Sequence, residues 1–169
     1  IHLPAAQWFS ILWLRQARWF RNDLSKRYAR LRLPQQLRKK KSGEPLAMGE
    51  SMITPCWQVI GRIVKTGDEV QFSSQNDHEA ILNWLEKSQP SYFMSFPGLL
   101  EELALSNNLK PLASSIESYL GVSSLMTQPM RDCLESAFQA PVHENYGLNE
   151  IGLVAARCSF GRYHIHLEH

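Results

Sequence analysis

The chain has 169 residues, 44% of them hydrophobic and 20% charged, which is the composition of an ordinary globular domain with a real core. No apolar run approaches the roughly 20 residues that a membrane span requires, so the sequence predicts no spanning helix. Three widely spaced cysteines, Cys56, Cys133 and Cys158, argue against a disulfide framework and predict a reducing, cytoplasmic location.

The formal net charge of +2 conceals a strong asymmetry along the chain. Residues 1–41 carry eleven Lys or Arg side chains and one acid, Asp23, whereas the remainder carries seven basic and fifteen acidic side chains. Such a basic arm is suited to phosphates, whether they belong to a nucleotide, coenzyme A, nucleic acid or an anionic membrane.

The two ends of the chain carry separate expectations. The chain begins at Ile1 rather than Met and has no cleavable signal pattern, which favours a start inside a longer protein. Residues 167–169 have two interpretations, native sequence or the first part of a histidine tag. We therefore treat residues 1–169 as a single partial α/β domain.

Residues 1–33 are predicted to form a basic amphipathic helix region. Apolar side chains recur there at spacings of three and four, the period of a helix with one buried face. They are Trp13, Ala17, Phe20, Leu24, Tyr28 and Leu31. Nucleic-acid binding by interleaved basic and aromatic residues is less favoured, because the aromatic side chains follow the period of a core. Residues 34–56 are expected to be a solvated loop without the glycine spacing of a phosphate loop.

From residue 57 to 169 the pattern is that of an α/β core. The expected strands are 57–64, 92–96, 115–121 and 143–146, the expected helices are 77–87, one that opens at Pro97, and 127–138, and an antiparallel pair, 153–157 with 163–167, closes the chain. Alternation of strands and helices implies crossover connections and a mostly parallel sheet. Ligands of such sheets bind beyond the carboxyl ends of the strands, here the loops after Phe96, Gly121 and Tyr146.

The most informative stretch runs from Glu144 to Gly152, where a strand ends in a turn bracketed by two glycines. Gly147 and Gly152 let the backbone bend sharply and approach a ligand closely. Tyr146 offers a flat face to a ring, and Glu150 offers the hard oxygen ligands that Mg²⁺ prefers. From these residue types alone, a plain hairpin or bulge is the favoured interpretation, and a functional turn is the alternative.

A second cluster of interest consists of Cys158, His164 and His166, which lie close together in sequence. Their spacing does not match a zinc site. Alternating residues of a strand are the favoured interpretation, and a metal site is the alternative.

Several of these motifs resemble the adenylate-forming superfamily of acyl-CoA synthetases and related ligases. The segment Tyr146-Gly147-Leu148-Asn149-Glu150 is similar to its Y-G-x-T-E motif. The residues that follow, with Cys158, Gly161 and His164, resemble the phenylacetate–CoA ligase and CapK-like branch. The segment from Pro90 to Ala104 is similar to the strand, proline turn and leucine-rich helix of that branch. The resemblance extends from residue 80 to residue 168 and is looser before it.

The resemblance implies roles for eight residues, in part by motif and in part by place in the chain. Tyr146 and Gly147 would contact the adenine of ATP or AMP, and Glu150 would hold Mg²⁺. Asn149 stands where the family has a threonine that touches the α-phosphate; its amide can still donate a hydrogen bond, but it is longer. The remaining residues are Gly121 and Ser123 in the adenine loop and Pro97 and Gly98 in the acyl pocket.

The resemblance implies an α/β fold: a mostly parallel sheet with flanking helices, part of the large N-terminal domain of such a ligase, with a C-terminal antiparallel hairpin. It also implies a reaction in which a carboxylate attacks the α-phosphate of ATP and a thiol, usually coenzyme A, then displaces AMP. The family's phosphate loop does not occur before residue 80, and its ribose-binding aspartate and catalytic lysine would follow residue 169. We therefore expect a fragment that is inactive alone.

Two alternatives to a carboxylic acid–CoA ligase remain open. One is a non-catalytic scaffold or binding domain derived from the same fold, favoured by Asn149 and by the altered loop after Gly121. The other is an α/β module that binds nucleic acid through its basic amino-terminal helix. The acid substrate, the acceptor thiol and the oligomeric state are not specified by the sequence.

Overall fold

The computed structural model describes residues 5–40, 42–148, 152–158 and 160–165. Among these residues, eight strands form one sheet in the order β2-β3-β1-β4-β5-β6-β7-β8. The elements are α1 (Ala5–Trp19), β1 (Tyr28–Arg32), η1 (Pro34–Gln36), β2 (Ser51–Thr54), η2 (Ile60–Arg62), β3 (Glu69–Ser73), α2 (His78–Ser88), β4 (Tyr92–Ser95), α3 (Pro97–Ser106), β5 (Ser118–Gly121), α4 (Gln128–Phe138), β6 (Val142–Leu148), β7 (Gly152–Arg157) and β8 (Tyr163–Ile165).

The centre of the sheet is parallel, as predicted. Strand β1 pairs in parallel with both β3 and β4, and the parallel ladder continues through β5 to β6. Strand β2 is antiparallel to β3 at one edge, and β6, β7 and β8 form antiparallel pairs at the other. The predicted fold class, a mostly parallel α/β sheet with flanking helices and a carboxyl-terminal hairpin, is therefore confirmed.

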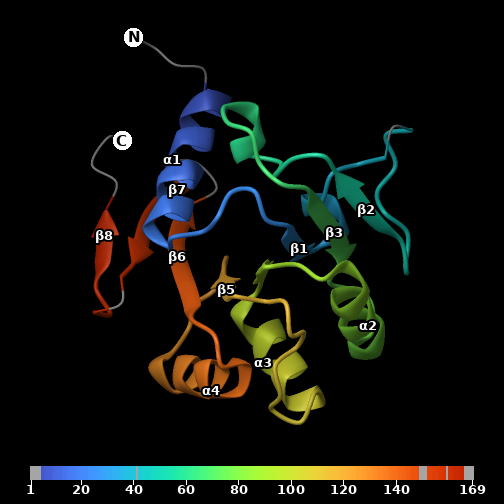
Figure 1. Cartoon of the computed structure of the whole chain (residues 1–169), viewed down its shortest axis with the longest axis vertical. Coiled ribbons are helices and arrows are strands. Elements are labelled where there is room, and N and C mark those ends of the chain that lie inside the picture. Colours follow the sequence, from blue (N-terminus) through green and yellow to red (C-terminus); the bar gives the residue numbers. More distant parts are fainter. Residues whose placement is uncertain (1–4, 41, 149–151, 159, 166–169) are drawn as a thin grey trace.

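The two faces of the sheet have separate cores. Helices α2, α3 and α4 cover one face, and α1 with η2 covers the other (Figure 1). Strand β1 serves both cores: Ala29 and Leu31 belong to the first and Tyr28 to the second. Because side chains alternate along a strand, Arg30 and Arg32 share the face of Tyr28 and α1.

The helices after residue 57 begin where the sequence predicts, because local signals set their first turns. The Asp77 side chain caps α2 by accepting a hydrogen bond from the backbone N–H of Ala80 at 2.7 Å. Thr127 caps α4 in the same way through Met130, and Pro97 opens α3. None of the helices among the described residues is both long and apolar enough to cross a membrane.

The predicted apolar stripe from Trp13 to Leu31 does not form one helix. Helix α1 ends at Trp19, and the chain turns at Arg21, whose φ of 58° lies in the left-handed region. Tyr28 and Leu31 belong instead to β1, a central strand with buried residues on both faces. Tyr28 and Leu31 are three residues apart and so fit a helical period, although the strand places them on opposite faces of the sheet.

Two further predictions for the first half of the chain are wrong. Residues 57–64 form no strand; they contain η2, and Trp57 and Ile60 pack into the core under α1. The indole of Trp57 donates to the carbonyl of Lys26 at 2.9 Å, which ties this segment to the turn before β1. The loop expected at 34–56 also contains strand β2.

Several basic residues of the first 41 positions are paired with acids in the folded protein. Four of them pair with acids from later in the chain: Arg27 with Asp68 at 2.8 Å, Arg30 with Glu69 at 3.1 Å, Lys26 with Glu117 at 2.6 Å and Lys40 with Glu50 at 2.5 Å. The folded protein thus compensates part of the asymmetry that suggested a nucleic-acid arm, and nucleic-acid binding stays a prediction.

The ring of His143 on β6 helps to hold the end of α1 against the sheet. It stacks on Phe20 with ring centroids 4.0 Å apart and planes inclined by 5°. Burial, with a smaller contribution from the charge of Arg131, lowers the pKa of His143 to about 4. The imidazole is therefore neutral in the folded protein near pH 6, whereas the unfolded chain binds a proton there.

We expect this pKa difference to weaken the fold as the pH falls from about 6.5 to 4. The unfolded state binds the extra proton in that window, so the free energy of unfolding decreases by up to about 3 kcal/mol. Denaturant unfolding at several pH values checks this, and His143→Gln should flatten the slope. His78→Gln is the control, because His78 is only half-buried and lies at the surface near Glu102, and an equal change of slope in both variants would contradict the role of burial.

Candidate functional site

A pocket of about 220 Å³ lies at the carboxyl ends of the parallel strands, on the face covered by α1. Its lining residues come from eight strands, helices or loops around that edge: Phe9, Trp13, Arg30, Arg32, Gln36, Val59, Met94, Val122, Ser123, Asn145, Gly147, Gly152 and Leu153. This is the position at which open parallel sheets bind their ligands. We call it the carboxyl-edge pocket.

Arg30 at the base of this pocket is compensated by a buried acid. Its guanidinium forms a fork with Glu69 of β3, with both N–O distances at 3.1 Å. Glu69 is fully buried and also accepts from the backbone of Gln58 and the amide of Gln71. Burial alone would lower the pKa of Arg30, but the carboxylate of Glu69 outweighs it and the pKa is raised.

Arg32, two residues further along β1, has only neutral partners among the described residues. Its Nε donates to Gln36 Oε1 at 3.1 Å and its terminal nitrogen donates to Ser123 Oγ at 3.0 Å. The guanidinium carbon lies 4.6 Å from the ring centroid of Phe96. Burial, and then the charge of Arg30, lower the pKa of Arg32 to about 10, so it stays protonated at neutral pH. The pocket therefore has an oriented positive charge that no acid among the described residues compensates.

One polar group in the wall of the pocket has no hydrogen-bond partner among the described residues. The indole Nε1 of Trp13 is buried and has no hydrogen-bond partner among the described residues. A buried donor without a partner is uncommon in proteins and is often explained by a water or a ligand. Together with Arg32, it makes the pocket suited to a ligand that carries oxygen acceptors.

The glycines of the predicted motif bring backbone close to the pocket. The pairing of β6 with β7 shifts register between Tyr146 and Gly147, and a Cβ on Gly147 would lie 2.9 Å from the carbonyl oxygen of Gly152. Gly152 has a φ of 79°, and a Cβ there would lie 2.6 Å from the ring of Phe9 on α1. Only glycine at these two positions allows the bulge and the contact with α1.

The structure brings together some of the predicted site residues and not others. Ser123 and Gly147 line the carboxyl-edge pocket, whereas Tyr146 is 52% exposed and does not line it. The neighbouring Asn145 faces α1, where its amide donates to Gln16 Oε1 at 3.3 Å. Asn149 and Glu150 lie outside the described residues, so their predicted roles remain predictions.

Gly121, Pro97 and Gly98 meet at the same edge but have different surroundings. A Cβ on Gly121 would lie 2.5 Å from the terminal methyl of Met126 and 3.1 Å from the ring of Pro97. Pro97 is buried and Gly98 is exposed with open space around it. Gly121 thus has a packing reason to be glycine, and a ligand contact by any of the three stays a prediction.

Within the described parts of the chain, no group of three His, Cys, Asp or Glu side chains is arranged to hold a metal ion. The proposed magnesium ligand Glu150 and the third member of the Cys–His cluster, His166, lie outside those parts. Assignment of Mg²⁺ therefore rests on the resemblance alone.

Sequence reasoning missed the most distinctive side chains of the pocket, Arg30 and Arg32. Both lie within residues 1–33, which the sequence predicts to be a basic amphipathic helix region. The available signal was their spacing of two within a segment that also contains buried Ala29 and Leu31, which puts the two arginines on one side of a strand.

Comparison with solved structures relates the fold to adenylate-forming ligases. A benzoate CoA ligase from Burkholderia xenovorans LB400 superposes with a TM-score of 0.64 at 11% identity, over 94% of this chain and 29% of that protein. The anthranilate CoA ligase AuaEII, solved in complex with anthranoyl-AMP, gives 0.63 at 14% identity, over 94% of this chain and 28% of that protein.

A luciferase-like enzyme from the nonluminescent mealworm Zophobas morio is similar as well, with a TM-score of 0.58 and 19% identity, over 90% of this chain. The chain spans less than a third of the length of these proteins: 28%, 29% and 31%. No family model and no curated protein matches the sequence. The fold is therefore that of the N-terminal domain of adenylate-forming ligases.

The surroundings of two glycines predict opposite effects of the same substitution. Gly121→Ala should lower the free energy of unfolding by about 1–3 kcal/mol, because the new methyl group overlaps Met126 and Pro97. Gly98→Ala should leave it unchanged or raise it by up to about 1 kcal/mol, because the site is open and helical. Urea denaturation of both variants checks this, and equal effects would contradict the packing role of Gly121.

Proposed function

We propose that this chain is part of an ATP-dependent ligase that activates a carboxylic acid as an acyl-adenylate, of the phenylacetate–CoA ligase type. The observation that carries the proposal is the carboxyl-edge pocket with the charge of Arg32, whose hydrogen-bond partners among the described residues are all neutral. The ligase-like fold and the motif from Tyr146 to Glu150 support it. The alternative of a non-catalytic binding domain is distinguished by the first experiment below.

In such a reaction, a carboxylate displaces pyrophosphate from the α-phosphate of ATP, and a thiol such as coenzyme A then displaces AMP. Both reactants of the first step are anions that repel each other in an apolar pocket. Arg32 reduces that repulsion by binding an oxyanion, and it is held in place by Gln36, Ser123 and the ring of Phe96. Arg30 is held by Glu69 and contributes mainly to the shape of the pocket floor.

The other residues of the proposed site act by position. Gly147 and the loop that contains Ser123 present backbone at the edge of the sheet, where a nucleotide can approach closely. Tyr146 would offer its exposed ring to the adenine, and Glu150 would bind Mg²⁺, which neutralises phosphate charge when present. The substrate is a small carboxylic acid. The shape of the complete acid pocket, to which the rest of the protein contributes, determines which acid is bound.

The proposal predicts carboxylate-dependent exchange of labelled pyrophosphate into ATP by the product of the complete gene. Formation of an acyl-adenylate is reversible, so each acid that is activated returns label to ATP. A panel of aromatic and aliphatic acids should include at least one that supports exchange above the acid-free background. Absence of exchange across the panel, with ATP binding retained, would instead favour the non-catalytic binding domain.

A second prediction concerns Arg32. We expect Arg32→Gln to lower kcat/KM for the acid by about 10- to 100-fold, the loss of one charge-assisted hydrogen bond. Arg32→Lys should recover part of this, because it retains the charge without the two-pronged geometry. The rates come from the exchange assay, with Arg62→Gln as the matched control on an exposed arginine outside the pocket. Equal rates for Arg32→Gln and the control, with folding intact, would remove Arg32 from the site.

A further inference from the structure

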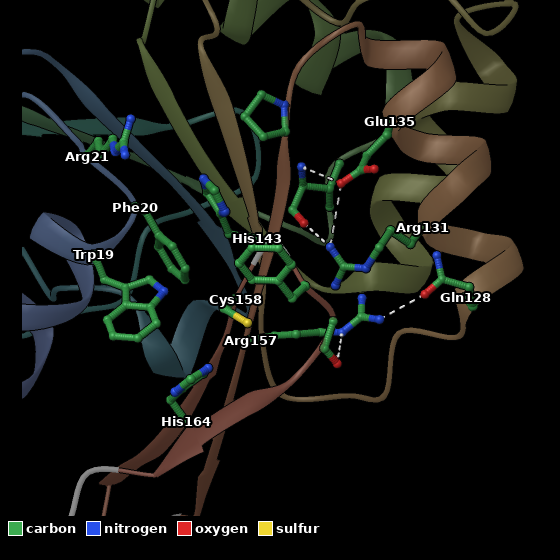
Figure 2. A pocket seen from close by; sticks show the side chains of 14 residues that line it. Trp19, Phe20, Arg21, Gln128, Arg131, Glu135, His143, Arg157, Cys158 and His164 are labelled. Carbon is green, nitrogen blue, oxygen red and sulfur yellow. Dashed lines mark hydrogen bonds and ion pairs between the residues drawn. The ribbon is translucent and has the colours of Figure 1, made fainter.

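A second and larger pocket lies at the amino-terminal end of β6, between the end of α1 and helix α4. Its volume is about 1040 Å³. The walls come from the end of α1, from α4, from the start of β6 and from the β7–β8 turn (Figure 2). We call it the amino-edge pocket. It shares no lining residue with the carboxyl-edge pocket.

The charge of this pocket is positive. Arg21, Arg131 and Arg157 line it, against one lining acid, Glu135. Arg157 donates from Nε to the carbonyl of Gly161 at 3.2 Å and from a terminal nitrogen to Gln128 Oε1 at 2.8 Å. Both acceptors are neutral, so these bonds orient the guanidinium without compensating its charge.

Arg131 contributes a buried donor that has no partner. Its residue is 8% exposed, and its terminal nitrogens bind Glu144 at 2.6 Å and the carbonyl of Val142. The Nε atom is buried and forms no hydrogen bond among the described residues. Figure 2 draws the side chains of Arg131 and Arg157 on the α4 side of the pocket, where Arg157 is tied to Gln128. Arg131 is paired with Glu144 at 2.6 Å and lies 3.7 Å from Glu135, so an oxyanion there would gain the free Nε donor of Arg131 and the charge of Arg157.

The opposite wall is aromatic. Trp19 is 48% exposed and lies 5.0 Å from the ring of His164, with the two planes inclined by 49°. Phe20 is stacked on His143, so this wall consists of flat side chains fixed by contacts with β6 and β8. The wall presents an apolar, planar surface opposite the two arginines (Figure 2).

We propose that the amino-edge pocket binds a small organic anion, with its carboxylate or phosphate group on Arg131 and Arg157 and its aromatic ring against Trp19. Arginine forks match the paired oxygens of both groups, and a ring on an indole face adds apolar contact. The volume is at the upper end of the range for small-molecule sites. This binding site does not depend on the proposed ligase activity.

The test is an NMR titration of the arginine side-chain N–H signals of the chain with AMP and, separately, with benzoate at low salt. We expect the Nε–H signals of Arg157 and Arg131 to move with saturation for at least one ligand. A response to AMP assigns phosphate as the bound group, and a response to benzoate assigns carboxylate. If neither ligand moves these two signals, the proposal is wrong.

Variants separate this site from the carboxyl-edge pocket. Arg157→Gln should weaken binding at least about tenfold, the loss of one charge-assisted contact, whereas Arg62→Gln should leave it unchanged. Arg157 is preferred to Arg131 for substitution because its partners are on the surface and the fold should survive. Trp19→Leu should weaken binding of the aromatic anion but not that of inorganic phosphate.

Comparison with Arg32→Gln distinguishes the two proposals. Binding that is removed by Arg32→Gln and unchanged in Arg157→Gln would place the ligand in the carboxyl-edge pocket and overturn the amino-edge site. Binding removed by Arg157→Gln but retained in Arg32→Gln would support the amino-edge site whatever the outcome of the pyrophosphate exchange assay.

Discussion

The ion pair between Arg30 and Glu69 sets the charge at the carboxyl edge of the sheet. Glu69 is fully buried on β3, and its carboxylate is satisfied by Arg30, by the amide of Gln71 and by the backbone of Gln58. A buried carboxylate that lost its partner would cost several kcal/mol, so the pair is fixed. The acid is thereby fully engaged with Arg30, and Arg32, on the same side of the same strand, keeps its charge for a ligand.

Helix α1 covers the carboxyl-edge pocket because Gly147 and Gly152 leave room for it to pack closely. The ring of Phe9 occupies the space in which any side chain at position 152 would lie, and Gly147 makes room for the bulge beside it. The motif glycines are therefore explained by packing as well as by access for a ligand. In this fold the two explanations agree, since the same close approach forms the wall of the pocket.

The predictability of the fold differs between the two halves of the chain for a physical reason. From residue 77 onward, most element boundaries coincide with local signals such as the caps Asp77 and Thr127 and the helix start at Pro97, and these were predicted correctly. The first half is determined by tertiary contacts. Strand β1 lies between β3 and β4, and its segment resembles a helix until those partners are known.

The parts of the candidate site that could be predicted are those where the backbone requires a particular residue or where the sheet topology fixes the position. The turn around Gly147 could be found because bends require glycine, and the rule for parallel sheets placed Ser123 at the same edge. The spacing of Arg30 and Arg32 places both arginines on one side of a strand, but it does not show which of them has an acid beside it. That depends on the three-dimensional neighbours, which for Arg32 are Gln36, Ser123 and Phe96 among the described residues.

The two pockets are adjacent in the fold but independent in their side chains. Helix α1 borders the carboxyl-edge pocket near its start, through Phe9 and Trp13, and the amino-edge pocket at its end, through Trp19. Strand β6 borders the carboxyl-edge pocket through Asn145 and the amino-edge pocket through His143. Between them, the hydrogen bond from Asn145 to Gln16 joins helix to strand. Because the two pockets share no lining residue, Arg32→Gln changes the lining of the carboxyl-edge pocket alone and Arg157→Gln that of the amino-edge pocket alone, so each site can be assigned by its own variant.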